Sequence, residues 1–168
     1  MRDGFCAQTG QDESDIVEYR LYHPADFEQL YAIEEACFDS TLRFDRRYMK
    51  QLTERASSAT WTAEEDNRLA GFVIVEWTRM LRGIVAYIQT IEVDPAFRRR
   101  GIARELLCRA EESAREAHAT YIWLHVDENN TAAIALYQNC GYQRHGHHEQ
   151  YYENGHSAEI YAKPLGAI

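Results

Sequence analysis

The sequence has no long apolar run, since the longest runs, such as residues 84–88, span about five residues. A membrane-spanning helix needs roughly 20 apolar residues, and no apolar signal core follows Met1. The four cysteines, Cys6, Cys37, Cys108 and Cys140, are scattered without short paired spacing. Without a secretory signal we expect reduced thiols and a cytoplasmic protein that does not contact membranes.

Basic residues are also scarce, with 18 Lys and Arg against 27 Asp and Glu and a net charge of −9. This excess of acid repels phosphates, excludes general binding to nucleic acid and favours a cationic partner. The 45% apolar and 27% charged residues are typical of a globular chain, and 168 residues suit one domain. Residues 1–15 are polar and acidic without periodicity, so we expect a mobile leader followed by a single domain over residues 16–168.

The apolar pattern alternates between the two-residue spacing of strands and the three- and four-residue spacing of helices. Strands are predicted over residues 17–22, 59–63, 69–77, 83–93, 121–126, 142–152 and 157–163. Helices are predicted over residues 26–38, 45–56 and 131–140, and for about 18 residues from Ile102. This order predicts an α/β fold in which a mixed, twisted sheet of about seven strands carries helices on both faces.

The most informative segment covers residues 91–103, where a strand ends and a long helix begins within a few residues. The first turn of a helix leaves about four N–H groups unpaired and carries partial positive charge. Gly101 and Ala103 remove side-chain bulk there, while Arg98, Arg99 and Arg100 add positive charge. The segment therefore predicts a pyrophosphate site that is neither a Walker loop nor a dinucleotide motif. The alternative is a solvated basic helix start whose glycine serves packing.

Residues 98–103 resemble the Gln/Arg-x-x-Gly-x-Gly/Ala motif of the GNAT acetyltransferase superfamily, and residues 91–95 resemble its preceding strand. Residues 130–137, followed by 140–142, resemble the family's next helix, so the resemblance covers roughly residues 16–165. It implies the GNAT acyl-CoA acyltransferase fold, with splayed central parallel strands, and acetyl-CoA as co-substrate. The branch it resembles most is that of the ribosomal-protein alanine and N-terminal protein acetyltransferases. The implied cofactor-binding residues are Ile91, Val93, Arg98, Arg99, Arg100, Gly101, Ile102, Ala103, Asn130 and Tyr137.

Tyr137 stands where the family places the tyrosine that acts as general acid toward the CoA sulfur, although it also suits a core position. The ribosomal-protein branch that this chain resembles has a glutamate acting as base twelve residues before the tyrosine. At that position this chain has His125. Strand alternation places His125 on one face with Tyr121 and Trp123. An imidazole with a pKa near ~6.5 can accept a proton, directly or through water. A hydrogen-bonded packing histidine is the alternative.

Glu92 is the second candidate base, on a neighbouring strand where alternation predicts a face shared with Ile88 and Thr90. A glutamate that only orients other groups is the alternative reading. The choice between His125 and Glu92 stays open at this stage.

The acceptor is suggested by residues 151–158, which resemble the Tyr-Tyr-x-x-Gly-x-x-Ala hairpin of N-terminal protein acetyltransferases. The resemblance implies that Tyr151 and Tyr152 line a peptide entrance together with Phe38, whose segment lacks the branch's Pro-Trp-Ser stretch. An ordinary aromatic hairpin is the alternative. The favoured substrate is the α-amine of a protein or peptide, with a small-molecule amine or a lysine side chain as alternatives. A non-catalytic CoA-binding sensor is the non-enzymatic alternative.

Four histidines, His145, His147, His148 and His156, stand close together near the C-terminus. No cysteine or carboxylate accompanies them at structural-zinc spacing, so we expect a solvated cluster and no metal. For the oligomeric state we expect a monomer or a homodimer.

Overall fold

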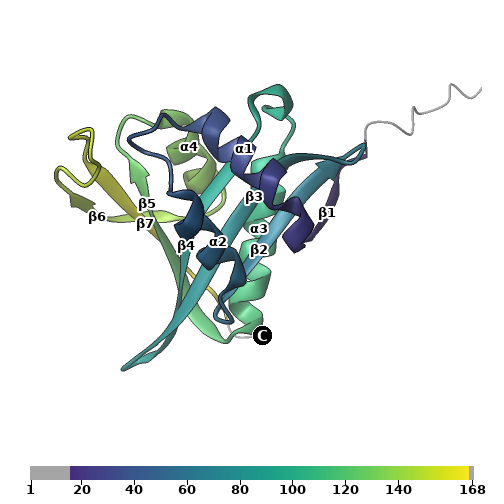
Figure 1. Cartoon of the computed structure of the whole chain (residues 1–168). Helices are drawn as coiled ribbons and strands as arrows, with labels where there is room; N and C mark the ends of the chain where they lie inside the picture. The colour runs from purple at the N-terminus through teal and green to yellow at the C-terminus, as the bar shows by residue number, and fades with distance from the viewer. Residues whose placement is uncertain (1–15, 167–168) are drawn as a thin grey trace, which may run out of the picture.

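The computed structural model describes residues 16–166 and contains a seven-stranded open sheet with helices packed against it (Figure 1). The predicted leader, residues 1–15, lies outside the described residues. The elements in chain order are β1 (Glu18–Leu21), η2 (Pro24–Asp26), α1 (Phe27–Cys37), α2 (Arg46–Glu54), β2 (Ser58–Glu65), β3 (Arg68–Met80), β4 (Gly83–Val93), η3 (Pro95–Phe97), α3 (Ile102–Glu116), β5 (Ala119–Asp127), α4 (Thr131–Asn139), β6 (Gln143–His148) and β7 (Ala158–Pro164). None of the helices in this described range is long and apolar enough to cross a membrane.

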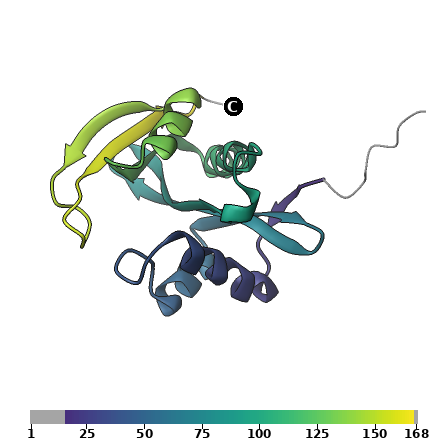
Figure 2. The ribbon, with the colours of Figure 1, turned by 90° about the horizontal axis from the view of Figure 1, so that it is seen from above.

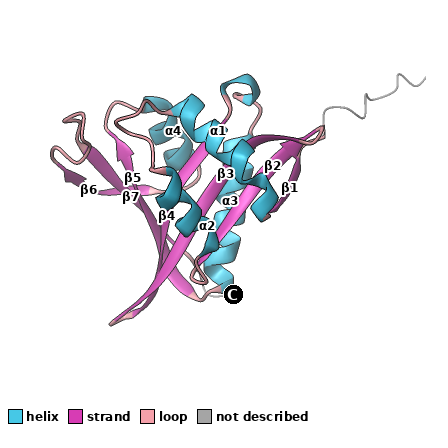
Figure 3. Ribbon diagram, in the orientation of Figure 1, coloured by secondary structure: helices cyan, strands magenta, loops and turns pink. Residues whose placement is uncertain are grey.

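The sheet has the strand order β1-β2-β3-β4-β5-β7-β6 (Figure 3). Neighbouring strands are antiparallel except for β4 and β5, which are parallel because the crossover through α3 separates them. The predicted mixed sheet of about seven strands is therefore confirmed.

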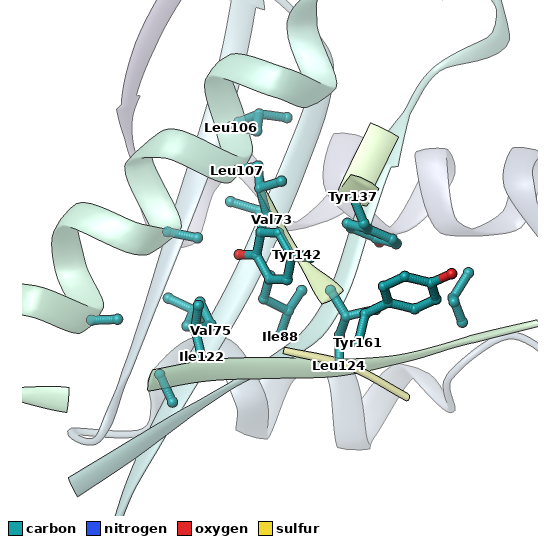
Figure 4. Close-up of a cluster of buried hydrophobic side chains, with 14 of the residues drawn as sticks. Val73, Val75, Ile88, Leu106, Leu107, Ile122, Leu124, Tyr137, Tyr142 and Tyr161 are labelled. Carbon is teal, nitrogen blue, oxygen red and sulfur yellow. The ribbon is translucent and has the colours of Figure 1, made fainter. Parts of the chain in front are cut away.

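Helices cover both faces of the sheet, as predicted: α1 and α2 lie on one face, and α3 and α4 on the other (Figure 2). Each face has its own apolar core. The α3 face buries Leu106 and Leu107 against strand residues such as Val73, with Tyr137 and Tyr142 closing the cluster (Figure 4). The other face buries Leu30, Met49 and Phe72 beneath α1 and α2. Burial of each such side chain contributes roughly 1.5–3 kcal/mol, so both faces hold the central strands in place.

The parallel pair at the centre of the sheet separates partway along its length. Pairing of β4 with β5 runs from Ile84 opposite Ala119 to Tyr87 opposite Trp123. The remaining residues of β4 continue to pair with β3, and those of β5 with β7. A wedge-shaped opening therefore forms between the two strands, as the predicted splayed strands require.

A bulge in β4 changes which side chains face α1. Ile74 of β3 pairs with Thr90 and Val75 pairs with Ile88, so Gln89 is an extra residue. Before the bulge, Ile88 belongs to the core beneath α3, and after it Ile91 and Val93 pack against that same core. The predicted shared face is therefore wrong for Ile88, because one inserted residue reverses the alternation, while Thr90 and Glu92 still share a face.

The C-terminal hairpin also differs from the prediction. Strand β6 ends at His148, not at Tyr152, and the connection to β7 covers residues 149–157. Tyr151 and Tyr152 therefore lie in a loop. That loop is held by a hydrogen bond from the Tyr152 N–H to the His156 carbonyl at 3.1 Å and another from the Gly155 N–H to the Tyr152 carbonyl at 2.9 Å.

Candidate active site

A cavity of about 1040 Å³ occupies the opening between β4 and β5 and extends under the segment between α1 and α2. It is lined by all of the predicted catalytic, cofactor-binding and acceptor-binding residues except Arg100. Side chains that are more than 100 residues apart in the sequence thus meet at one place, at the point where the sheet opens.

One end of the cavity is the start of α3. Gly101 is the N-cap of this helix and has φ +80°, a left-handed conformation that favours glycine. A Cβ added at Gly101 would meet no protein atom within 4 Å, so the space in front of the first amides of α3 is open. Arg98 and Arg99 line the cavity beside this helix end. The amides, the helix dipole and two guanidinium groups therefore suit a large anion.

Arg100 lies apart from this anion site. Its guanidinium donates two hydrogen bonds to the Glu65 carboxylate, at 2.9 and 2.6 Å, and stacks over the Phe97 ring. This pair lowers the pKa of the Glu65 carboxyl. The Arg100 side chain thus connects the loop before α3 to the end of β2.

Tyr137 and Asn130 place α4 against the cavity. Tyr137 is only 5% exposed, and its ring centroid lies 5.8 Å from that of Tyr142 (Figure 4). Burial raises the pKa of the Tyr137 phenol, so it keeps its proton at neutral pH. Asn130 is the N-cap of α4, and its Oδ1 accepts a hydrogen bond from the Ala133 N–H at 3.1 Å. Tyr137 therefore packs in the core and also lines the cavity.

His125 forms a hydrogen bond with a residue that the sequence analysis did not select. Its Nδ1 lies 3.0 Å from the Tyr87 hydroxyl, and its ring stacks on Tyr151 with centroids 4.2 Å apart. Burial, followed by the nearby charge of His148, lowers the pKa of His125 below its ordinary value of 6.5. The imidazole is therefore neutral at pH 7 and able to accept a proton.

The bulge explains why Tyr87 was missed. Simple alternation along β4 puts Tyr87 and Glu92 on opposite faces, whereas the extra residue Gln89 brings both to the side of α1 and α2. The parallel register of β4 and β5 would have indicated Tyr87, because Tyr87 pairs with Trp123, two residues before His125.

Glu92 is almost fully buried, at 4% exposure, next to Glu34 of α1, which is 1% exposed. Its Oε1 accepts a hydrogen bond from the Thr90 hydroxyl at 2.6 Å. Burial, and then the neighbouring Glu34, raise the pKa of Glu92 well above its ordinary value. A carboxyl that holds its proton is a poor base at neutral pH, in contrast to His125.

Part of the cavity wall is aromatic. Phe38 from the segment after α1 and Tyr151 and Tyr152 from the loop after β6 all line it. The Tyr151 and Tyr152 rings meet edge to face with centroids 4.9 Å apart. The three residues predicted to meet the acceptor thus come from two separate loops that both line the cavity.

The histidines near the C-terminus are distributed over β6 and the following loop. In the part of the chain that the structure describes, His147 is grouped with Glu128 and Glu159, with ligand atoms within 4.8 Å of one another. Glu159 already accepts a hydrogen bond from Arg144. The positive charge of this arginine balances the carboxylate of Glu159. Sequence spacing gave no sign of this group because its members come from three different segments.

The open sheet, the cavity between two splayed parallel strands and the anion site at a helix start define a class of α/β proteins that bind an extended anionic cofactor. The chain belongs to the acetyltransferase (GNAT) family, whose model matches residues 27–142. It is therefore a member of an enzyme family, as the motif at residues 98–103 predicted.

Relatives with different substrates resemble this chain. It is 38% identical over 90 residues to the streptothricin acetyltransferase of Streptomyces lavendulae, covering 53% of this chain and 47% of the relative. It is 35% identical over 106 residues to the ribosomal protein bS18-alanine N-acetyltransferase of Salmonella typhimurium, covering 60% of this chain and 67% of the relative. The first match thus spans about half the length of that relative.

The fold resembles that of Arabidopsis thaliana NAA60 in complex with acetyl-CoA, with a TM-score of 0.80 at 20% identity. The superposition covers 89% of this chain and 99% of NAA60. The likeness concerns the fold alone.

Proposed function

We propose that this protein transfers the acetyl group of acetyl-CoA to the α-amine of a protein or peptide by direct attack in a ternary complex. The observation that supports this most strongly is the continuity of the cavity, which joins the anion site at α3 to the neutral His125 and to the aromatic loops. A cofactor and an acceptor can therefore meet between β4 and β5.

The residues present fit acetyl-CoA. The open space in front of Gly101 and the α3 amides suits the pyrophosphate, with Arg98 and Arg99 beside it. Main-chain groups of Ile91 and Val93 are proposed to bind the pantetheine arm where β5 has moved away from β4. The bound thioester supplies an activated acyl carbon, and the protein supplies positioning and proton transfer.

His125 is the proposed base. In the tautomer that serves this role, Nδ1–H donates to the Tyr87 oxygen and leaves Nε2 free to take a proton from the acceptor ammonium. The neutral amine then attacks the acyl carbon. An α-amine suits this step, because its pKa near ~8 requires less from the base than a lysine at ~10.4.

Tyr137 is the proposed acid. When the carbon–sulfur bond breaks, the electron pair remains on sulfur and the phenol proton goes to that thiolate. The second proton of the attacking nitrogen leaves as the amide forms and restores the phenol. The products are the N-acetylated acceptor and CoA with a free thiol. Phe38, Tyr151 and Tyr152 are proposed to hold the acceptor backbone at the entrance. A cytoplasmic location, a monomer or homodimer and the absence of a metal stay predictions.

A small-molecule amine is the second candidate acceptor. The specific support is the match to streptothricin acetyltransferase, which is 38% identical over 90 residues. The departure at residues 38–44 from the Pro-Trp-Ser stretch leaves room for this alternative on the acceptor side.

A peptide library incubated with the purified protein and acetyl-CoA, read by tandem mass spectrometry, tests the proposal. We expect acetylation of N-terminal nitrogens and little of lysine side chains. Acetylation of streptothricin or polyamines without any peptide product would favour the second candidate. Binding of CoA without turnover across both panels would favour the CoA sensor.

A further inference from the structure

The carboxyl groups of Glu34 and Glu92 lie next to each other in the wall of the cavity. Both side chains line it, and both are more than nine-tenths buried. Their Oε1 atoms have donors, the Phe44 N–H at 2.6 Å for Glu34 and the Thr90 hydroxyl for Glu92. Their Oε2 atoms are buried and find no donor within residues 16–166.

Neighbouring groups do not neutralise this pair. Arg98, the guanidinium at this end of β4, donates instead to the Val93 carbonyl at 3.2 Å and to Cys37 Sγ at 3.5 Å. Burial raises the pKa of the Cys37 thiol to about 11, so this group is neutral at pH 7 and brings no positive charge to the pair. Two adjacent buried carboxyls need either a shared proton or a cation between them.

The position of the pair identifies which ligand can bring that cation. The cofactor motif lies at the start of α3, on one side of the sheet, while Glu34 belongs to α1 on the other side (Figure 2). Glu34 also holds the segment between α1 and α2 through the Phe44 N–H, and that segment carries Phe38. The two carboxyls therefore lie beside the segment that carries Phe38, a proposed acceptor contact, and the expected acceptor is cationic.

We propose that Glu34 and Glu92 form a cation subsite that selects acceptors carrying an ammonium or guanidinium group in addition to the reacting amine. The subsite rests on the proposed function and names its substrate class. When a guanidinium or ammonium enters the cavity, the shared proton leaves to solvent and the cation donates to the two carboxylates. A neutral acceptor of the same shape leaves both carboxyls as they are, so charge and not size is recognised.

The test uses two matched peptides with arginine or citrulline at the first or second residue, because citrulline keeps the shape of arginine without its charge or a competing nucleophile. For the wild type we expect kcat/KM to be at least about tenfold higher with arginine, as one charged hydrogen-bonded contact allows. The ratio should approach one in Glu92→Gln and in Glu34→Gln, which keep size and an acceptor oxygen. Glu35→Gln, on the same helix but exposed and paired with Arg43, should retain the wild-type ratio.

Calorimetric titration of the same peptides into the protein with CoA reads the subsite without turnover. A ratio near one in the wild type, or a wild-type ratio retained in either Gln variant, overturns the subsite. An equal loss in Glu35→Gln assigns the preference to general surface acidity and overturns it as well. Absence of α-acetylation of both peptides, with the affinity ratio intact, would refute the proposed function and leave the cation subsite standing.

Discussion

At the scale of single residues, the two proposed proton-transfer groups owe their chemistry to burial. Burial keeps His125 neutral and Tyr137 protonated, which are the states a base and an acid need before reaction. Glu92 is as deeply buried as Tyr137 and lies beside Glu34, so it keeps its proton. The sequence could nominate all three residues, but not rank them, because ranking depends on how far each is removed from water.

Replacing His125 by alanine should lower kcat/KM by about 10²–10⁴, the usual contribution of a positioned base. In the wild type the rate is expected to rise with pH through the His125 pKa, which lies below 6.5, and to be lost as pH falls through it. A pH–rate series on peptide acetylation measures both effects. His125→Ala should lack this acid limb, and a limb that survives unchanged in it would remove His125 as the base.

His148→Gln is the matched variant, because His148 lies 6.1 Å from His125 between ring centroids and its charge lowers the pKa of His125. Removal of that charge should move the acid limb to higher pH without abolishing it. A limb that moves to lower pH would contradict the electrostatic role of His148.

Tyr137→Phe keeps the ring that packs against Tyr142 and removes only the phenol proton. We expect kcat to fall by about 10²–10⁴ while the Kd for acetyl-CoA stays within about threefold, because the lost proton matters only when the thiolate leaves. Single-turnover kinetics and calorimetry measure the two quantities. Unchanged turnover would mean that Tyr137 is a core residue only.

At the scale of elements, regular patterns were readable and interruptions were not. The bounds of β4, residues 83–93, follow directly from its apolar alternation between Gly83 and Asp94. The Gln89 bulge escaped detection because it changes pairing without changing composition. The early end of β6 escaped for a related reason, since Tyr151 and Tyr152 favour strands locally but are held in a loop by the hydrogen bonds of residues 152–156.

Close approach of β3 to β4 beside the site depends on Gly71. A Cβ at this position would lie 2.6 Å from the Glu92 carbonyl oxygen and 3.3 Å from Leu106 Cδ1. Gly71→Ala should therefore lower the free energy of unfolding by about 1–3 kcal/mol and raise KM for acetyl-CoA, because β4 must shift. Denaturant titration and steady-state kinetics measure the two effects.

Gly146→Ala on β6 provides the comparison, since its Cβ would meet Ile160 at an ordinary 3.4 Å. It should change stability by no more than about 0.5 kcal/mol. Equal destabilisation by both substitutions would show that generic loss of glycine, and not the contact with Glu92, causes the effect.

At the scale of the whole molecule, the separation of faces organises the proposed reaction. The helix that starts the anion site belongs to one layer, and α1 with its carboxyl group belongs to the other (Figure 2). The proposed cofactor and acceptor would therefore approach one opening from different sides. Net charge predicted the cationic partner but not this arrangement. The location of the site depends on the long-range pairing between β4 and β5, and no local sequence pattern predicts that pairing.

The net charge of −9 should attract a cationic acceptor over long range. Between about 0.01 M and 0.15 M salt the Debye length shrinks from about 30 Å to about 8 Å, so this attraction is screened. We expect KM for the arginine peptide to rise several-fold over that range, while KM for the citrulline peptide changes by less than about twofold. In Glu92→Gln the KM for the arginine peptide should depend on salt as in the wild type, because a buried carboxyl contributes little to the electric field outside the protein. The preference of this variant for arginine over citrulline should nevertheless be lost. A flat KM in the wild type would show that the surface charge does not assist acceptor capture, and the short-range carboxyl pair would then be the sole source of any preference for cations.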